Sequence, residues 1–264
     1  MPYGGAVQAD GITSANTVGY SSQSVVAGQF YMVAVQFADV QASADVAGFN
    51  KFFATTCTPG EYGDGNDPSM NNAPQIQVLN AGGLSYTKYY YISDAYDAED
   101  NPVDGNCWAS QDGYIATDAD ALALAKGFWF KAMTAGTITC SGQVSATSDL
   151  GSTVTADQFN IVANAYPVAL NLNAAASTNF TPGEYGDGND PSMNNAPQIQ
   201  VLNAGGLSYT KYYYISDAYD AEDNPVEGNC WASQDGYIAT GTQIPVGQSF
   251  WVKSASAGTF TFSL

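Results

Sequence analysis

Alternation of apolar and polar residues along the chain predicts β-strands. A strand pattern begins near residue 18, and residues 29–37 are rich in β-branched and aromatic side chains. Residues 75–79 and 84–93 flank an Ala-Gly-Gly turn, which is typical of a hairpin. Two further strands are expected at residues 127–132 and 136–140.

The second strand of the hairpin has a regular alternation, which places neighbouring side chains on opposite faces. One face carries Leu84, Tyr86, Tyr90 and Ile92, and the other carries Ser85, Thr87, Tyr89 and Tyr91. Long amphipathic helices are missing from the pattern. Residues 49–53 are expected to form one helical turn, and residues 118–126 are the best candidate for a short helix.

The chain carries one stretch of sixty residues twice. Residues 58–117 recur as residues 181–240 with a single exchange, Asp104 for Glu227. Looser matches flank both copies, and they include the strands predicted before and after the block. We therefore predict an all-β fold of two tandem, homologous modules, each an antiparallel sandwich or partly open barrel. The modules span residues 1–143 and 144–264, joined by a linker at residues 145–152.

Composition excludes several classes of function. The chain has no histidine and no arginine, and six lysines stand against 25 acids, giving a net charge of −19. Without histidine there is no Ser-His-Asp or Cys-His relay and no imidazole metal ligand. Nucleic acid and anionic membranes would be repelled, because both bind through lysine and arginine. Hard cations are the ligands that such an excess of carboxylates would attract. A charged, solvated surface is the simpler interpretation of the same charge.

The expected location is extracellular or at a cell surface. No run of about twenty apolar residues is present, so we expect no membrane insertion. The first residues lack the basic and apolar regions of a signal peptide. Either the chain stays in the cytoplasm or it is a mature or recombinant form. Few lysines and abundant Thr, Ser, Asn, Gly and Tyr favour secretion.

Two of the four cysteines differ between the two copies. Cys57 aligns with Phe180 and Cys140 aligns with Phe262, so both cysteines are replaced by the same bulky residue. A Cys57–Cys140 disulfide would explain this joint exchange and would require an oxidising compartment. The alternative is a pair of buried free thiols. Cys107 and Cys230 occupy equivalent positions and suggest no pairing.

Three strings of residues resemble a known type of module. They are VAGQFYMVA at residues 26–34, GFWFK at residues 127–131 and GTIT at residues 136–139, with counterparts in the second copy. The chain resembles the tandem β-rich modules of large secreted and surface proteins of bacteria, whose first strand often reads GWNLIS. Phe30 stands where that tryptophan would be. The resemblance implies an extracellular, non-catalytic building block and supplies no catalytic residues.

Two acidic loops in each copy predict calcium sites. Calcium takes six to eight oxygen ligands at flexible geometry, and Gly-rich acidic loops can supply them. The alternative is ordinary turn chemistry, in which Asp, Asn and Gly shape a solvent loop. No organic cofactor is expected. The candidate ligands are Glu61, Asp64, Asn66, Asp67, Asp94, Asp97, Glu99, Asp100 and Asp104, and in the second copy Glu184, Asp187, Asn189, Asp190, Asp217, Asp220, Glu222, Asp223 and Glu227.

Acidic and aromatic residues of the chain could also serve catalysis or sugar binding. Paired carboxylates can hydrolyse glycosides, but such sites usually also have a shaped cleft with Arg, His or Trp partners, so we expect no enzyme. Aromatic side chains could instead form a platform for sugar rings, although such residues more often fill cores. The platform candidates are Tyr89, Tyr91, Trp108, Tyr212, Tyr214 and Trp231.

The module boundaries predict self-association. The second module ends where a further lead-in strand would begin, and residues 1–17 have no module before them. We expect the N-terminal segment of one copy to add a strand to the last module of another, giving a head-to-tail filament. A chain cut from a longer array is the alternative. The expected function is an extracellular structural or adhesive fibre subunit, or otherwise a pair of carbohydrate-binding modules.

Overall fold

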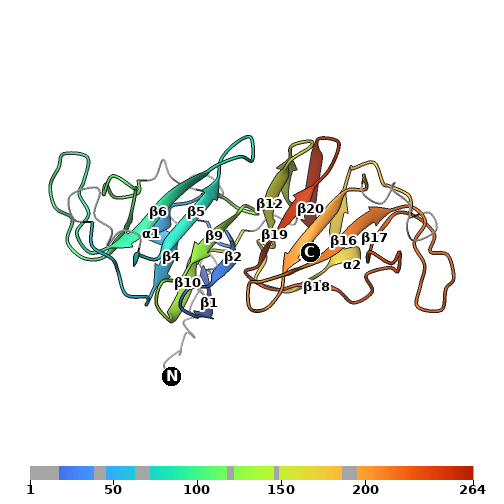
Figure 1. Cartoon of the computed structure of the whole chain (residues 1–264), viewed down its shortest axis with the longest axis horizontal. Coiled ribbons are helices and arrows are strands. Elements are labelled where there is room, and N and C mark those ends of the chain that lie inside the picture. The colour runs from blue at the N-terminus through green and yellow to red at the C-terminus, as the bar shows by residue number, and fades with distance from the viewer. Residues whose placement is uncertain are drawn as a thin grey trace, which may run out of the picture.

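The computed structural model describes residues 18–38, 46–62, 72–117, 122–145, 149–185 and 195–263. The predicted all-β fold is confirmed: antiparallel strands make up both ends of an elongated molecule (Figure 1). The first half has strands β1 (Val18–Val25), β2 (Phe30–Ala34), β3 (Val46–Ala47), β4 (Phe53–Thr55), β5 (Gln75–Leu79), β6 (Tyr86–Ile92), β7 (Cys107–Ala109), β8 (Leu122–Ala123), β9 (Gly127–Lys131) and β10 (Gly136–Gln143), with helix α1 (Phe49–Phe52). The second half has strands β11 (Asp149–Val154), β12 (Phe159–Ala163), β13 (Leu170–Asn171), β14 (Ala176–Thr178), β15 (Gln198–Leu202), β16 (Tyr209–Ile215), β17 (Cys230–Ala232), β18 (Gln243–Ile244), β19 (Ser249–Lys253) and β20 (Gly258–Ser263), with helix α2 (Leu172–Ala175).

The same sheet order occurs in both halves. In the first half, a three-stranded sheet β1-β10-β4 accompanies a five-stranded sheet β2-β9-β5-β6-β7 and a short ladder β3-β8. In the second half, β11-β20-β14, β12-β19-β15-β16-β17 and β13-β18 repeat this order. No helix among these described residues has the length and apolar content that crossing a membrane requires.

Aromatic rings fill the space between the sheets of the first half. The Phe53 ring on β4 lies 5.2 Å from Phe128 and 5.7 Å from Phe130, both on β9 of the facing sheet. Trp108 is only 1% exposed, and its indole N–H donates to the Phe53 carbonyl at 3.1 Å. Asn50 of α1 joins this core, because its side chain accepts from the Trp108 backbone N–H at 2.6 Å.

In the second half the inner rings come from a different strand. Phe260 and Phe262 of β20 lie 5.5 and 5.9 Å from Phe250 of β19. Trp231 occupies the place of Trp108 and packs 5.7 Å from Phe260. The buried residues of the two halves form one continuous apolar cluster. A division into separate folding units at residue 143 stays a prediction.

Most of the predicted elements are confirmed, and two are wrong. The hairpin comprises β5 and β6, and the helical turn is α1. Alternation along β6 also holds, since Tyr90 and Ile92 join one buried cluster and Tyr89 joins the other. The predicted helix fails within residues 122–126, which form β8 and a turn. The predicted linker fails at residues 149–152, which belong to β11.

The predicted Cys57–Cys140 disulfide is wrong. All four cysteines lie in the described part of the chain, and all four are free and buried. Cys140 lies opposite Phe53 in the β10–β4 ladder, whereas Cys57 lies against Gly136. Four residues of extended strand separate those two positions by about 13 Å, and a disulfide needs Cα atoms within about 7 Å. Phe180 likewise meets Gly258 rather than Phe262.

Candidate functional site

The second predicted calcium loop of each copy, residues 94–104 and 217–227, uses carboxylates to hold its own turns. The Asp97 carboxylate accepts the backbone N–H groups of Glu99 at 3.0 Å and Asn101 at 2.8 Å, and also the Asn101 side-chain amide. Hydrogen bonds from Asn101 lower the pKa of Asp97. Asp220 makes the same bonds in the second half, and its pKa is lowered for the same reason.

Neighbouring carboxylates in the loop have similar roles. Asp94 accepts the Tyr62 backbone N–H at 2.6 Å, and Asp100 accepts the Tyr114 hydroxyl at 2.6 Å. Asp100 also has a left-handed backbone, with φ of 62°, which Asp tolerates in turns. These contacts match the turn interpretation that the sequence left open.

Calcium binding stays a prediction. Within the described residues, no three His, Cys, Asp or Glu side chains gather as a metal site. The described candidates are Glu61, Asp94, Asp97, Glu99, Asp100 and Asp104, with Glu184, Asp217, Asp220, Glu222, Asp223 and Glu227. The remaining candidates, Asp64, Asn66, Asp67, Asp187, Asn189 and Asp190, lie outside the described residues.

The predicted aromatic platform is wrong for Tyr89, Trp108 and Trp231, because these side chains lie inside the sandwich. Trp108 and Trp231 are each 1% exposed, and Tyr89 is 6% exposed with its ring 4.8 Å from Phe49. The Tyr91 ring packs against Trp108 in a tilted arrangement, with ring centroids 5.2 Å apart. Tyr212 and Tyr214 are partly buried against the same core, and Tyr212 also lines the pocket described below.

The two halves meet through pairs of equivalent contacts. The Ala34 N–H of β2 donates to the Gly247 carbonyl at 2.9 Å, and the Ala163 N–H of β12 donates to the Ala125 carbonyl at 3.0 Å. Ala34 and Ala163 are equivalent residues, and so are Gly247 and Ala125. Each half therefore donates from its equivalent alanine to the equivalent carbonyl of the other half. Contacts across a two-fold axis have this reciprocal form. Edge strands β2 and β12 lie at the centre of the molecule (Figure 1).

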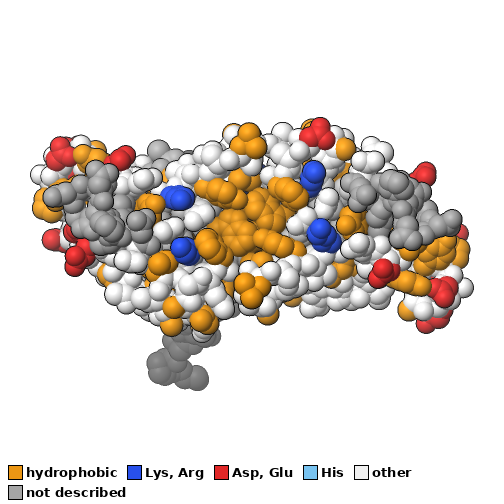
Figure 2. Space-filling view, viewed as in Figure 1, with side chains coloured by type: hydrophobic (Ala, Val, Ile, Leu, Met, Phe, Trp, Pro, Cys, Tyr) orange, Lys and Arg blue, Asp and Glu red, His pale blue; other side chains and the backbone are white. Residues whose placement is uncertain are grey.

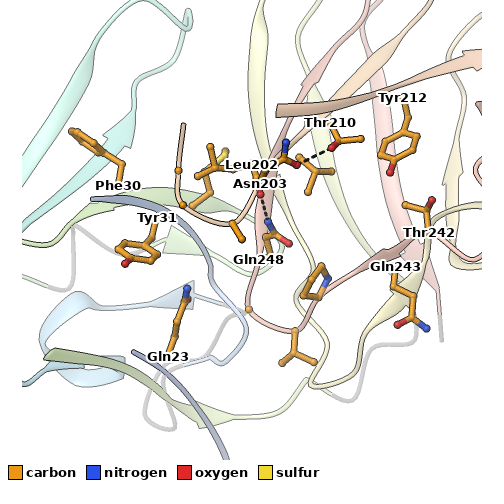
Figure 3. A pocket seen from close by; sticks show the side chains of 18 of the residues that line it. Gln23, Phe30, Tyr31, Leu202, Asn203, Thr210, Tyr212, Thr242, Gln243 and Gln248 are labelled. Atoms are coloured by element: carbon orange, nitrogen blue, oxygen red, sulfur yellow. Dashed lines mark hydrogen bonds between the residues drawn. The ribbon is translucent and has the colours of Figure 1, made fainter. Parts of the chain in front are cut away.

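A pocket of about 590 Å³ opens on one side of this junction and is called pocket 1 (Figure 3). The first half contributes β1 and β2, and the second half contributes the β15–β16 turn and the segment from β18 to β19. None of the described residues that line it is charged. Its polar side chains are those of Ser22, Gln23, Tyr31, Asn203, Thr210, Tyr212, Thr242, Gln243 and Gln248.

Hydrogen bonds fix the wall of pocket 1. The Gln248 side-chain amide donates to the Leu202 carbonyl at 3.0 Å, and the Thr210 hydroxyl donates to the Asn203 side-chain oxygen at 2.7 Å (Figure 3). Gln23 and Gln243 are exposed and extend from β1 and β18. The pocket thus combines a rigid hairpin wall with amide groups that reach solvent.

A second pocket, called pocket 2, occupies the equivalent place on the other side of the junction. Its volume is about 530 Å³, and it lies between the β5–β6 turn of the first half and β12 of the second. Its polar lining includes Asn80, Gln158 and Asn160. Lys126 stands where pocket 1 has Gln248, and burial lowers the pKa of this lysine.

Between the pockets, six aromatic side chains form the central aromatic patch: Phe30, Tyr86 and Trp129, with their equivalents Phe159, Tyr209 and Trp251. The Trp129 and Trp251 rings lie 6.2 Å apart across the junction, and each tryptophan also meets a phenylalanine edge to face. The side chain of Trp129 is hydrogen-bonded to the Tyr86 hydroxyl. Burial is the main reason why the pKa of Tyr86 is raised. The patch lines a shallow depression of about 400 Å³.

Lysines border the patch on both sides (Figure 2). Lys131 lies 5.5 Å above the Phe30 ring, and Lys253 lies 5.5 Å above the Phe159 ring. Lys88 and Lys211 occupy the same sheet face as the tryptophans, in register with Gln77 and Gln200. Four of the chain's six lysines therefore surround one aromatic surface.

Sequence reasoning missed both the pockets and the patch. Alternation within residues 127–131 already separates Trp129 and Lys131 from the buried Phe128 and Phe130, so one signal for the patch was present. The pockets gave no such signal, because their walls come from opposite halves of the chain. Comparisons with family models, with curated proteins and with solved structures found no match to this chain.

Proposed function

We propose that this protein is a non-enzymatic recognition protein that binds neutral carbohydrate in pocket 1. The supporting observation is the uncharged lining of pocket 1 in a chain whose net charge is −19. Amides, hydroxyls and aromatic rings are the groups that hydrogen-bond sugar hydroxyls and stack on sugar rings. An anionic ligand would instead favour a lysine within the lining, and Lys126 supplies one in pocket 2 but not in pocket 1.

The size of pocket 1 supports this proposal. Its volume of about 590 Å³ lies within the usual range for small-molecule sites, roughly 300–1,000 Å³.

Isothermal titration calorimetry with neutral hexasaccharides of glucose, mannose, xylose and N-acetylglucosamine tests the proposal. We expect at least one of them to bind, and the double variant Gln23→Ala/Gln243→Ala to bind it about tenfold more weakly, since two neutral hydrogen bonds are lost. Gln111→Ala/Gln234→Ala is the matched control, because these exposed glutamines lie in the turns next to the acidic loops. Absence of binding to every hexasaccharide, or equal loss in the control, would reject the proposal.

An extracellular fibre subunit is the second candidate function. The observation that favours it is the separation of charge along the molecule, with lysines at the centre and acids at both ends (Figure 2). Strand addition needs a different site from the one expected, because β20 is already paired with β11 and β14 within the described sheet. The secreted location remains part of this proposal, and the free cysteines remove one argument for it.

A further inference from the structure

We propose that the central aromatic patch is a docking surface for the acidic end of a second copy of this chain. The acidic end of the first half is defined by residues 94–105 and 110–115, and that of the second half by residues 217–228 and 233–238. This inference develops the fibre candidate and does not rest on carbohydrate binding, and the patch shares Phe30 with the lining of pocket 1.

The patch has the composition of a protein interface. Phe30, Tyr86 and Phe159 are each 37% exposed, and Tyr209 is 38% exposed. Contiguous aromatic surface of this kind costs free energy in water and marks interaction sites. Tyrosine and tryptophan at the centre with charges at the rim is the arrangement of a binding hot spot. The lysines at the rim select a partner of negative charge.

Each acidic end has the opposite character. The first end carries six acids and no lysine: Asp94, Asp97, Glu99, Asp100, Asp104 and Asp112. Tyr96 and Tyr114 project from it with 37% and 41% exposure, so it also offers rings to an aromatic surface. The hydrogen bond from the Tyr114 hydroxyl to Asp100, together with the charge of that carboxylate, raises the pKa of Tyr114.

The acidic end is held in one shape before it meets a partner. The Tyr96 N–H donates to the Gly113 carbonyl at 3.0 Å, and the Ile115 N–H donates to the Tyr96 carbonyl at 2.8 Å. The Val103 N–H donates to the Ala95 carbonyl at 2.8 Å, which closes the acidic loop on itself. Little ordering is then lost on docking, which favours affinity.

Charge argues against the simplest alternative within the same chain. Two patches placed face to face would bring the lysines of both copies together, and like charges at an interface cost several kcal/mol. An end placed on a patch brings opposite charges together. Because an end of one copy meets the patch of another, the contact is heterologous, and it builds open assemblies where the rotation between copies does not close a ring.

Sedimentation velocity of the purified full chain without carbohydrate tests the contact. We expect reversible association that grows with protein concentration and weakens between about 0.15 M and about 0.5 M salt, as rim charges are screened. Monomers at all concentrations would overturn the docking proposal together with the fibre candidate. Such a result would leave the pocket proposal intact, because no glycan is present.

Charge reversal identifies the two surfaces. A patch variant carries Lys88→Glu, Lys131→Glu, Lys211→Glu and Lys253→Glu. An end variant carries Glu99→Lys, Asp104→Lys, Glu222→Lys and Glu227→Lys, which spares the carboxylates that hold the turns. We expect each variant alone to associate at least about tenfold more weakly than the native chain, and an equimolar mixture of the two to recover association.

The controls keep the result interpretable. Lys51→Glu lies on α1, which packs against β4, β7 and β10, and is compared with Lys131→Glu as a matched single reversal. Circular dichroism and thermal unfolding confirm that each variant is folded. Association that persists in the patch variant, or falls equally in Lys51→Glu, overturns the proposal. A mixture that fails to recover association shows that the patch has another occupant, which also overturns it.

Discussion

The repeated sixty residues fold in the same way in two different settings. The Tyr114 hydroxyl donates to Asp100 at 2.6 Å, and its copy Tyr237 donates to Asp223 at 2.6 Å. The buried tryptophans differ, although their sequence neighbours are identical. The Trp108 indole N–H bonds to the Phe53 carbonyl, whereas the Trp231 indole N–H has no partner among the described residues. Local bonds therefore follow the repeat, and core contacts follow the flanking strands.

The flanking strands solve one packing problem in two ways. In the first half, a large residue on β4 faces a small one on β10: Phe53 opposite Cys140. In the second half the order is reversed, with Ala176 on β14 opposite Phe262 on β20. Each half therefore pairs one large residue with one small residue at these positions, and such a volume-conserving arrangement is tolerated best.

Removing the large residue from the Phe53–Cys140 pair has the largest expected effect on the free energy of unfolding. Phe53→Ala should lower the free energy of unfolding by about 3 to 5 kcal/mol, because it opens a cavity among the core rings. Adding Cys140→Phe places a ring where the second half has Phe262, and should restore at least about half of that loss, as coupled neighbours do. Urea unfolding measures both values. A double variant no more stable than Phe53→Ala would contradict the comparison.

The two buried tryptophans, Trp108 and Trp231, are expected to differ by a smaller amount in their contribution to stability. Trp108→Phe and Trp231→Phe remove the same volume, but only the first also breaks a buried hydrogen bond. Trp108→Phe should therefore be more destabilising by about 1 kcal/mol, the usual net value of such a bond. Chemical denaturation followed by circular dichroism would show the difference. Equal losses would mean that the indole N–H of Trp231 also finds a partner.

The smallest expected effect is on the carboxyl pKa values of the acidic loops, where the second copy serves as a control for the first. NMR titration should place the carboxyl pKa values of Asp97 and Asp220 below the ordinary value of 3.8. Hydrogen bonds favour the charged form, so their stabilisation is present above this value and is lost as pH falls through the lowered pKa. Asn101→Ala should raise the pKa of Asp97 in part and leave that of Asp220 unchanged. Parallel changes at both residues would contradict a local cause.

Much of the fold could be predicted from local patterns, but the site could not. Strand β5, the hairpin and α1 follow from alternation and turn residues that lie close together in the chain. The burial of Trp108 depends on Phe53 and Asn50, which lie more than fifty residues away in the sequence. Gln23 of β1 and Gln243 of β18 line the same pocket, and no local pattern indicates that these two strands contribute to one site.

The most direct test of the account is an NMR titration of the labelled protein with the tightest-binding neutral hexasaccharide. Pocket recognition predicts backbone amide shifts at Gln23, Thr242 and Gln243, with smaller shifts or none at the acidic residues Glu99 and Glu222. Shifts confined to the acidic loops, or none at the junction at saturating hexasaccharide, would contradict the claim that the junction of the two halves is the binding site.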